Sequence, residues 1–413
     1  MRKVLAMFLV IVLSLSMVTI AANAEGKTIV YWSMWNSTEP QGMVIQKAVD
    51  AYVAATGNTV DLQFKGRNGI REGLEAALEA GTTIDLFDED IDRVSKTWNK
   101  YLLNLEELAA STNFEATANA GLMAACRASA GGQLMSIPYQ PFVFNFFYNP
   151  AIFEAAGVTA VPTTWAEFLD VCQKIKDAGF IPITCDDAYI DCMLGYHMAR
   201  YLGSDGVSKV VKEGLWAEEP AVLKTAQQYE ELAAKGFFSP TIASSVWPTN
   251  QNGEFALEGA AAMYLNGSWL PNEVREMTDP DFVFGCFAYP TVEGGLTGLD
   301  AANFGAQAYG INKNTQVAAE AFDLITYVTK GQFDQELSQE SWGIPADTTN
   351  TDWPAALANV KPVMDNVKIR YPWAAGIQDN PDMTPIIVEN FKKLCGGTMT
   401  AQEFVDTLEA AGK

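Results

Sequence analysis

Aromatic, amide and acidic side chains follow short apolar runs of this chain, in an arrangement that suits the binding of a polyhydroxylated ligand. Trp35 and Asn36 follow the first such run, and Asp88 and Glu89 follow the third. A sugar presents apolar C–H faces and rims of hydroxyl groups, so a site for it combines aromatic rings with carboxylates and amides. We therefore expect these four residues to contribute to one ligand site.

The acidic run that begins at Asp88 has two other interpretations. The spacing Asp88-x-Asp90-x-Asp92 begins like a calcium loop, but Arg93 stands where such a loop requires glycine and Asn99 where it requires a bidentate glutamate. The same carboxylates also suit the solvated start of a helix, where the helix dipole favours negative charge. We predict no metal site here, and the choice between ligand contact and helix start stays open.

The sequence lacks the residues that most kinds of catalytic site require. His197 is the one histidine, so the chain offers no histidine-based triad and no multi-histidine metal site. It also has no nucleophile elbow and no phosphate loop. A secreted glycosidase with two catalytic carboxylates is the remaining enzymatic alternative, but among 50 acidic residues a candidate pair carries no information. We predict a non-enzymatic protein without a cofactor.

The elements that would position these residues alternate between strand and helix patterns. A β-rich run over 28–32 is followed by a helix that Gly57 closes, an alternating strand over 60–64, a helix that ends at Gly81 and a third strand over 84–87. This order predicts a doubly wound, mainly parallel sheet. Such sheets bind ligands beyond the carboxyl ends of their strands, which is where the candidates lie.

A second α/β unit follows in the sequence. Thr164 and Glu167 form a capping box for a helix that Gly179 ends, and Asp187 follows the next strand, over 180–184. We therefore add Asp187 to the candidate site. Helices are also predicted near residues 94–105, 191–202, 221–234, 270–277, 317–329, 333–340, 353–366, 384–394 and 401–411, and strands near 133–139, 142–149, 260–265 and 282–287.

The first 24 residues predict export. Arg2 and Lys3 precede an apolar stretch over 4–20, and Ala22 and Ala24 are the small residues that signal peptidase requires, so we expect the mature chain to begin near Glu25. A single membrane-spanning helix is the alternative, but 17 residues is at the short limit for crossing a bilayer. No cysteine lies at the cleavage site, so we expect no lipid anchor, and localisation in the periplasm or at the cell surface.

Size and charge narrow the class of protein further. About 390 residues exceed what one core usually organises, so two domains are expected. Loss of Arg2 and Lys3 moves the net charge from −23 to −25, which disfavours nucleic acid and anionic membranes as partners.

The six cysteines form no C-x-x-C pair and so no zinc site. Cys185 and Cys192 are the closest pair in sequence, but spacing alone does not predict a disulfide.

Several segments together resemble the extracellular solute-binding proteins of carbohydrate ABC transporters, the group that includes maltose-binding protein. The resemblance covers nearly the whole mature chain, and it depends on the order and spacing of its motifs. These motifs lie at residues 28–35, 81–86, 138–168, 255–269 and 343–345. The resemblance implies two α/β lobes joined by a hinge of crossing segments, with lobe 1 formed by residues 25–141 and 303–347 and lobe 2 by residues 142–302 and 348–413.

The resemblance also implies further site residues and partners. Trp269, which follows an Asn-Gly pair, matches an aromatic position of the family and is the leading candidate for stacking on a sugar ring. Tyr139 lies at the first crossover. Further candidates in segments that are harder to align are Trp247, Asn303, Trp342 and Trp373. The implied partners are a carbohydrate ligand and the permease subunits of an ABC importer, with the binding protein expected as a monomer.

Alternatives to these assignments remain open. Trp35 and Trp342 also suit simple packing at a lobe edge, because tryptophan is often a partly buried core residue. The same fold also suits a non-sugar solute such as a polyamine or another cationic small molecule, since many loops are acidic. The aromatic content favours a neutral sugar.

Overall fold

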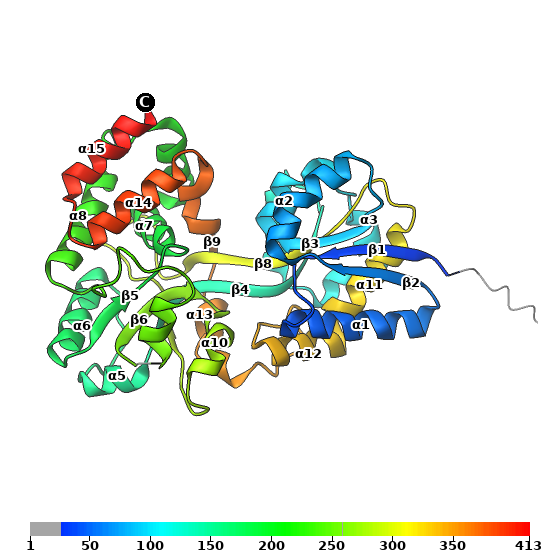
Figure 1. Cartoon of the computed structure of the whole chain (residues 1–413), viewed down its shortest axis with the longest axis horizontal. Helices are drawn as coiled ribbons and strands as arrows, with labels where there is room; N and C mark the ends of the chain where they lie inside the picture. Colours follow the sequence, from blue (N-terminus) through cyan, green and yellow to red (C-terminus); the bar gives the residue numbers. More distant parts are fainter. Residues whose placement is uncertain (1–25, 258) are drawn as a thin grey trace, which may run out of the picture.

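The computed structural model describes residues 26–257 and 259–413. It shows two lobes, each a sheet with helices on both faces, connected by the long strands β4 and β8 (Figure 1). The two-lobed α/β class expected from the sequence is confirmed. The expected signal peptide lies outside the described residues.

The first lobe holds the N-terminal α/β unit and a returning segment. Its first segment comprises β1 (Thr28–Ser33), α1 (Pro40–Thr56), β2 (Thr59–Phe64), α2 (Gly66–Glu79), β3 (Leu86–Asp90), the π-helix η1 (Arg93–Thr97), the 3₁₀ helices η2 (Asn99–Tyr101) and η3 (Phe114–Thr117), α3 (Glu106–Ser111), α4 (Ala120–Ser129) and the start of β4 (Ile137–Tyr148). The end of β8 (Ala301–Ile311) returns the chain, and α11 (Ala318–Thr329) and α12 (Gly331–Ser341) complete the lobe.

The second lobe holds the middle of the chain and its C-terminal helices. Its elements are α5 (Pro150–Ala155), α6 (Trp165–Asp177), β5 (Ile181–Thr184), α7 (Ile190–Glu213), α8 (Pro220–Ala234), α9 (Asn250–Asn252), η4 (Gly253–Leu257), β6 (Ala261–Gly267), α10 (Leu270–Glu273), η5 (Arg275–Met277), β7 (Gly285–Phe287), η6 (Ala355–Leu357), α13 (Lys361–Asp365), β9 (Ile369–Tyr371), η7 (Trp373–Asp379), α14 (Thr384–Cys395) and α15 (Ala401–Gly412).

Hydrogen bonds connect the strands of both lobes in the order β2-β1-β3-β8-β4-β6-β5. β1 pairs with β2 and β3 in parallel, and β5 pairs with β6 in parallel, as expected for two α/β units. The two connecting strands run antiparallel to each other and to their neighbours β3 and β6. This arrangement places the carboxyl ends of β1, β2 and β3 next to the connection between the lobes.

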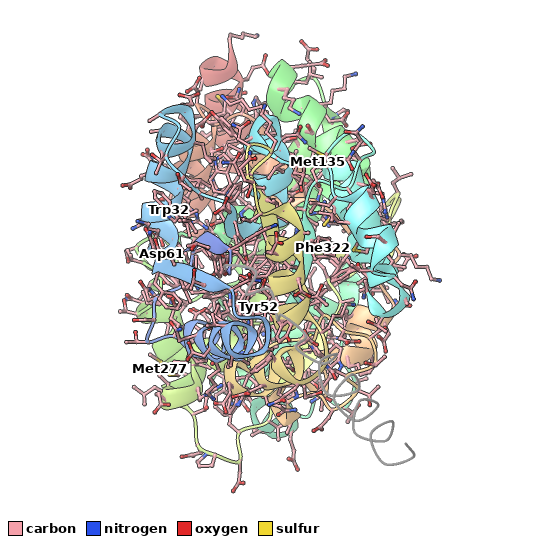
Figure 2. All side chains as sticks on the ribbon, turned by 90° about the vertical axis from the view of Figure 1, so that its right-hand side faces the viewer. Trp32, Tyr52, Asp61, Met135, Met277 and Phe322 are labelled. Carbon is pink, nitrogen blue, oxygen red and sulfur yellow. The ribbon has the colours of Figure 1, made fainter. Side chains whose placement is uncertain are left out.

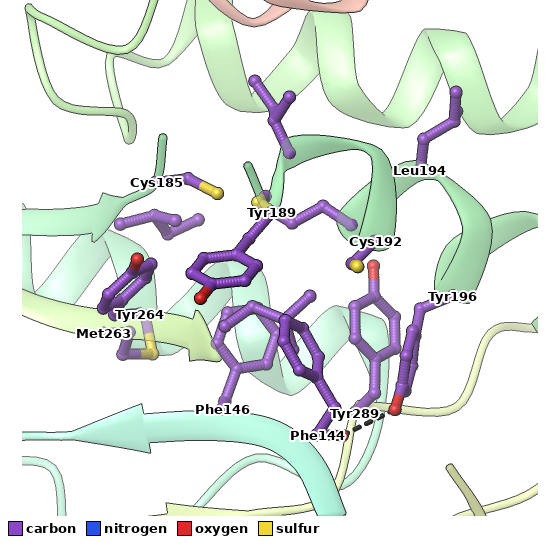
Figure 3. Packing of buried hydrophobic residues seen from close by; sticks show 14 of the residues in the cluster. Phe144, Phe146, Cys185, Tyr189, Cys192, Leu194, Tyr196, Met263, Tyr264 and Tyr289 are labelled. Carbon is purple, nitrogen blue, oxygen red and sulfur yellow. Dashed lines mark hydrogen bonds between the residues drawn. The ribbon is translucent and has the colours of Figure 1, made fainter. Parts of the chain in front are cut away.

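Each lobe has its own buried core. Tyr52 and Phe322, both labelled in Figure 2, belong to the first cluster, and Phe146 and Tyr264 in Figure 3 belong to the second. Along β4 the cluster changes between Tyr139 and Val143, and along β8 it changes at Gln307. Residues 303–306, which the sequence division assigns to lobe 1, therefore lie on the second-lobe side of that change. The exact lobe boundaries stay a prediction.

Local sequence signals account for many element ends. Gly57 closes α1 with a φ of 74°, as its position predicts, and Thr164 and Glu167 form the expected capping box of α6. The two strands expected over 133–139 and 142–149 form one strand, β4, with an irregularity between Tyr139 and Pro141.

Two helices predicted as continuous are divided into shorter pieces. Over 94–105 the chain forms most of a short π-helix, η1, and the 3₁₀ helix η2. Leu102 then makes a β-bridge with Asn312, so a sheet contact ends the helical series. Over 353–366 the chain divides into η6 and α13, because Pro362 lies at the start of α13, where it lacks the amide that a continuous helix needs. Within the described ranges, all six cysteines are free.

Candidate functional site

A cavity of about 910 Å³ lies between the lobes. Residues of both lobes and of the connecting segments line it, including Trp35 from the first lobe, Trp269 from the second and Gln140 and Gln307 from the connecting strands. This is the position that the sheet rule predicts, at the carboxyl ends of the first-lobe strands.

The second-lobe wall of the cavity is aromatic. The rings of Trp269 and Trp373 lie nearly parallel, with an interplanar angle of 22° and centroids 6.2 Å apart. Phe142 meets Trp269 edge-on at 5.2 Å, and the Trp269 indole donates to the Tyr189 hydroxyl at 3.3 Å. Four rings therefore form one surface, which we call the aromatic platform (Phe142, Tyr189, Trp269 and Trp373).

Gly267 sets the position of Trp269. A Cβ atom at Gly267 would lie 2.3 Å from carbons of the Trp269 ring, so only glycine leaves room for this side chain. The Asn-Gly pair that precedes the tryptophan therefore has a steric role in the platform.

Trp35 faces the cavity from the first lobe, and a buried network holds it. Its indole N–H donates to the Tyr139 hydroxyl at 2.7 Å, and this hydroxyl donates to the Asp88 carboxylate at 2.5 Å. Tyr139 and Asp88 are fully buried and do not line the cavity. Burial raises the pKa of Asp88 to about 6, although hydrogen bonds from Tyr139 and Tyr31 oppose this shift. Both residues therefore support Trp35 from behind.

Glu89 also lies behind the cavity wall. It is fully buried within β3, and its carboxylate contacts Arg71 at 2.6 Å and Arg93 at 3.5 Å. Both arginines line the cavity, together with Asp90. Glu89 therefore fixes two guanidinium groups that are available to a ligand.

Trp247 lines the cavity from the second lobe and is 44% exposed. Its indole donates to Glu273 at 2.7 Å and its backbone N–H donates to Asp187 at 2.9 Å. Glu273 lines the cavity, and burial raises its pKa. Asp187 does not line it, so Asp187 acts on the position of Trp247.

Of the remaining predicted residues, Asn36 and Asn303 do not line the cavity, whereas Trp342 does. The Asn36 side chain donates to Glu39 at the start of α1, and Asn303 donates to the Tyr371 carbonyl between β8 and β9. Trp342 lines the cavity, with the Arg275 guanidinium 4.2 Å from its ring centroid. The predicted residues that the structure brings together around one cavity are thus Trp35, Trp247, Trp269, Trp342 and Trp373.

The described residues include no group of three or more His, Cys, Asp or Glu side chains arranged to hold a metal ion. The acidic residues that begin like a calcium loop lie instead in β3 and the turn after it, where Glu89 and Asp92 pair with arginines. None of the helices within 26–257 and 259–413 combines the length and the apolar character of a membrane span.

The sequence profile of the family described as bacterial extracellular solute-binding protein matches residues 36–330. The chain belongs to this family. It is similar to the multiple sugar-binding protein of Streptococcus mutans, with 25% identity over 203 residues that cover 48% of this chain and 47% of the relative. The match thus spans about half the length of that relative.

The fold of this solute-binding protein is also found in solved structures of other binding proteins. A chitin oligosaccharide binding protein matches with a TM-score of 0.73 and 19% identity, covering 94% of this chain and 98% of the other. The binding protein RafE in complex with raffinose matches with a TM-score of 0.72 and 18% identity, covering 93% and 98%. At these identities, the likeness supports the fold.

Strained backbone in this solute-binding protein gathers at the cavity. The described chain has five non-glycine residues with positive φ, and four of them lie at or beside the wall: Gln140, Trp342, Ala374 and Ala375. The two alanines directly follow Trp373 of the platform. Non-glycine residues adopt this conformation at a cost, and such strain clusters at ligand sites.

Sequence reasoning missed several residues of the wall. Arg67 and Arg71 lie in the first two turns of α2, beyond the carboxyl end of β2, where the sheet rule places ligand contacts without naming a residue. Gln140 and Gln307 also line the cavity. They lie in the middle of the two connecting strands, so no strand end or turn in the sequence marks them as site residues.

Proposed function

We propose that this protein is the substrate-binding subunit of an ABC importer for a carbohydrate. The observation that carries the proposal is the aromatic platform, which opens onto a cavity whose other walls carry amides and paired charges. Aromatic rings stack on the C–H faces of a pyranose, while the polar groups hydrogen-bond to its hydroxyls. The sugar-related names of the relative and the solved structures support the same class of ligand.

The ligand is captured between the lobes and handed to permease subunits in the membrane. A ligand that contacts Trp35 and the platform together gains contacts from both lobes, so it favours the conformation in which they approach. We propose export to the periplasm or the cell surface, without a lipid anchor, and action as a monomer without catalysis. The lining carries both carboxylates (Glu39, Asp90, Asp92, Glu273 and Asp379) and cationic side chains (Arg67, Arg71, Arg93 and Lys96). This mixture of charges suits a neutral ligand.

A thermal-shift experiment on residues 25–413 tests this function. The probes are raffinose, N,N′-diacetylchitobiose, maltotriose and xylotriose, with spermidine as the cationic comparison. A ligand that binds only the folded state at 100 times its Kd stabilises it by about 2.7 kcal/mol. We expect a rise in Tm with at least one sugar, and recovery of that sugar unchanged.

Each other outcome has a defined meaning. A rise in Tm with spermidine alone would show that the ligand is a cationic solute and not a sugar. Cleavage of a bound sugar would contradict the non-catalytic role. An unchanged Tm with all four sugars would contradict the proposed function.

A further inference from the structure

The floor of the cavity is formed where the two connecting strands cross between the lobes. Gln140 on β4 and Gln307 on β8 both line it. In both side chains the amide oxygen is buried without a hydrogen-bond partner in the described part of the chain. A buried acceptor without a partner is unfavourable, so two such atoms in one cavity floor require an explanation.

The orientation of the Gln140 amide follows from its neighbours. Its Nε2 donates to the Ser341 hydroxyl at 3.0 Å, and that hydroxyl donates its own proton to the Leu337 carbonyl at 2.6 Å. Because a hydroxyl has one proton, Ser341 can only accept from Gln140. The nitrogen must therefore face Ser341, and the oxygen is the end left without a partner.

The backbone at Gln140 is also exceptional. Its φ is 44°, and it is the extra residue where the pairing of β4 with β8 shifts between Tyr139 and Pro141. Its side chain lies against Gly343, where a Cβ atom would be 2.9 Å from the amide nitrogen. Gln140 thus joins one connecting strand to the segment after α12 at the point where the chain passes between the lobes.

We propose that Gln140 is a ligand-contacting residue of the hinge, whose amide oxygen accepts a hydrogen bond from a hydroxyl or amide N–H of the ligand. This inference rests on the proposed function. The oxygen is shielded in this structure, so the donor reaches it when the backbone at the bulge moves. A ligand with that donor binds the rearranged hinge more tightly, which is the requirement for a population shift.

The proposal has a consequence for specificity. A site that accepts a hydrogen bond from a particular hydroxyl discriminates against an analogue that lacks it, because the acceptor stays unpaired. Gln140 therefore selects ligands by their hydrogen-bond donors, whereas the platform tolerates any ring with an apolar face.

Three variants separate the amide from the backbone strain. Gln140→Ala removes the amide and keeps a Cβ at positive φ, and Gln140→Gly removes both. Asn113→Gly is the control, because Asn113 has a φ of 52° and does not line the cavity. The Kd of each variant is measured by calorimetry with raffinose, N,N′-diacetylchitobiose, maltotriose and xylotriose.

We expect Gln140→Ala to weaken the binding of the sugars that wild type binds by about 2- to 10-fold, the effect of one hydrogen bond. Gln140→Gly should show the same loss with a higher Tm of the empty protein, because glycine adopts this φ freely. Asn113→Gly should keep the wild-type Kd. Among monodeoxy analogues of the bound sugar, one should bind wild type more weakly and bind Gln140→Ala as well as the parent sugar does.

Two results would overturn the inference while the proposed function stands. One is a wild-type Kd in Gln140→Ala for every sugar, and the other is an equal loss for the parent sugar and all its monodeoxy analogues in this variant. Failure of wild type to bind any of the four sugars would instead overturn the proposed function and this inference with it.

Discussion

At the scale of single residues, the platform depends on one tryptophan and the glycine beneath it. Trp269 contacts Phe142 edge-on, stacks near Trp373 and donates to Tyr189, so it joins the other rings. Gly267 leaves the space that its ring occupies. Loss of the Trp269 ring would therefore open the centre of the wall.

Trp269→Ala should weaken sugar binding by about 1 to 3 kcal/mol, because the ligand loses the largest apolar surface on which it stacks. Calorimetry with the sugar that wild type binds measures this change. Trp353→Ala is the matched control, since Trp353 packs at the edge of the second core and does not line the cavity. An equal Kd in Trp269→Ala and wild type would remove this ring from the site.

The sequence predicted which segments lie near the site better than it predicted which of their side chains are buried behind the cavity wall. The motif around Gly267 placed Trp269 at the cavity, whereas Asp88 and Glu89 were expected in a loop and lie inside β3. An apolar run does not show where its strand ends, so it could not show that these carboxylates support Trp35 and Arg71 from behind. Arginines such as Arg71 were missed because a charge at the start of a helix is usually a solvated residue.

At the scale of elements, the left-handed turn after Trp373 depends on its packing against α7. Ala374, Ala375 and Gly376 have positive φ in succession, and a Cβ atom at Gly195 of α7 would lie 1.9 Å from the Ala374 carbonyl oxygen. Close approach of α7 therefore fixes the turn that presents Trp373 to the cavity.

Gly195→Ala should force α7 and this turn apart. We expect a loss of about 1 to 3 kcal/mol in the free energy of unfolding from overpacking, together with weaker sugar binding as Trp373 moves. Chemical denaturation and calorimetry measure the two effects. Gly73→Ala is the control, because Gly73 lies in α2 with open space around it and alanine should stabilise this helix by about 0.5 to 1 kcal/mol. Unchanged stability and Kd in Gly195→Ala would contradict this account.

Helices with clear ends were predictable from sequence, and connecting elements were not. Gly57 and the Thr164–Glu167 capping box mark their helices by local chemistry. The bridge between Leu102 and Asn312 joins residues far apart in the chain, so no local pattern could show that it ends the expected helix there. The bulge at Gln140 has the same origin, because it arises from the pairing of β4 with β8.

At the scale of the whole molecule, the two lobes are stabilised by separate cores and communicate through few segments. β4 and β8 each pass from one cluster to the other within a few residues, and the cavity lies at this passage. A ligand at the floor therefore contacts the same segments that must bend when the lobes move. This is why a strained residue such as Gln140 can affect both affinity and conformation.

The molecule also carries buried acids in both lobes within a strongly acidic chain, and this determines its pH dependence. Burial raises the pKa of Asp186 to about 7 and those of Asp88, Asp191 and Asp334 to about 6. In the unfolded chain these groups titrate near 3.9. Between about pH 4 and pH 7 the native state therefore binds more protons, so stability should rise as the pH falls through this range.

We expect the Tm to be higher at pH 5 than at pH 7.5 in the same salt, since protonation of these carboxyls also reduces the self-repulsion of the acidic chain. The stability that the raised pKa values provide is complete below about pH 4 and is lost as the pH rises through 6 to 7. Asp186→Asn should flatten the change between pH 6 and pH 7, because Asp186 has the highest of the four pKa values. A Tm that falls steadily from pH 7.5 to pH 5 would show that these carboxyls are ionised in the native protein.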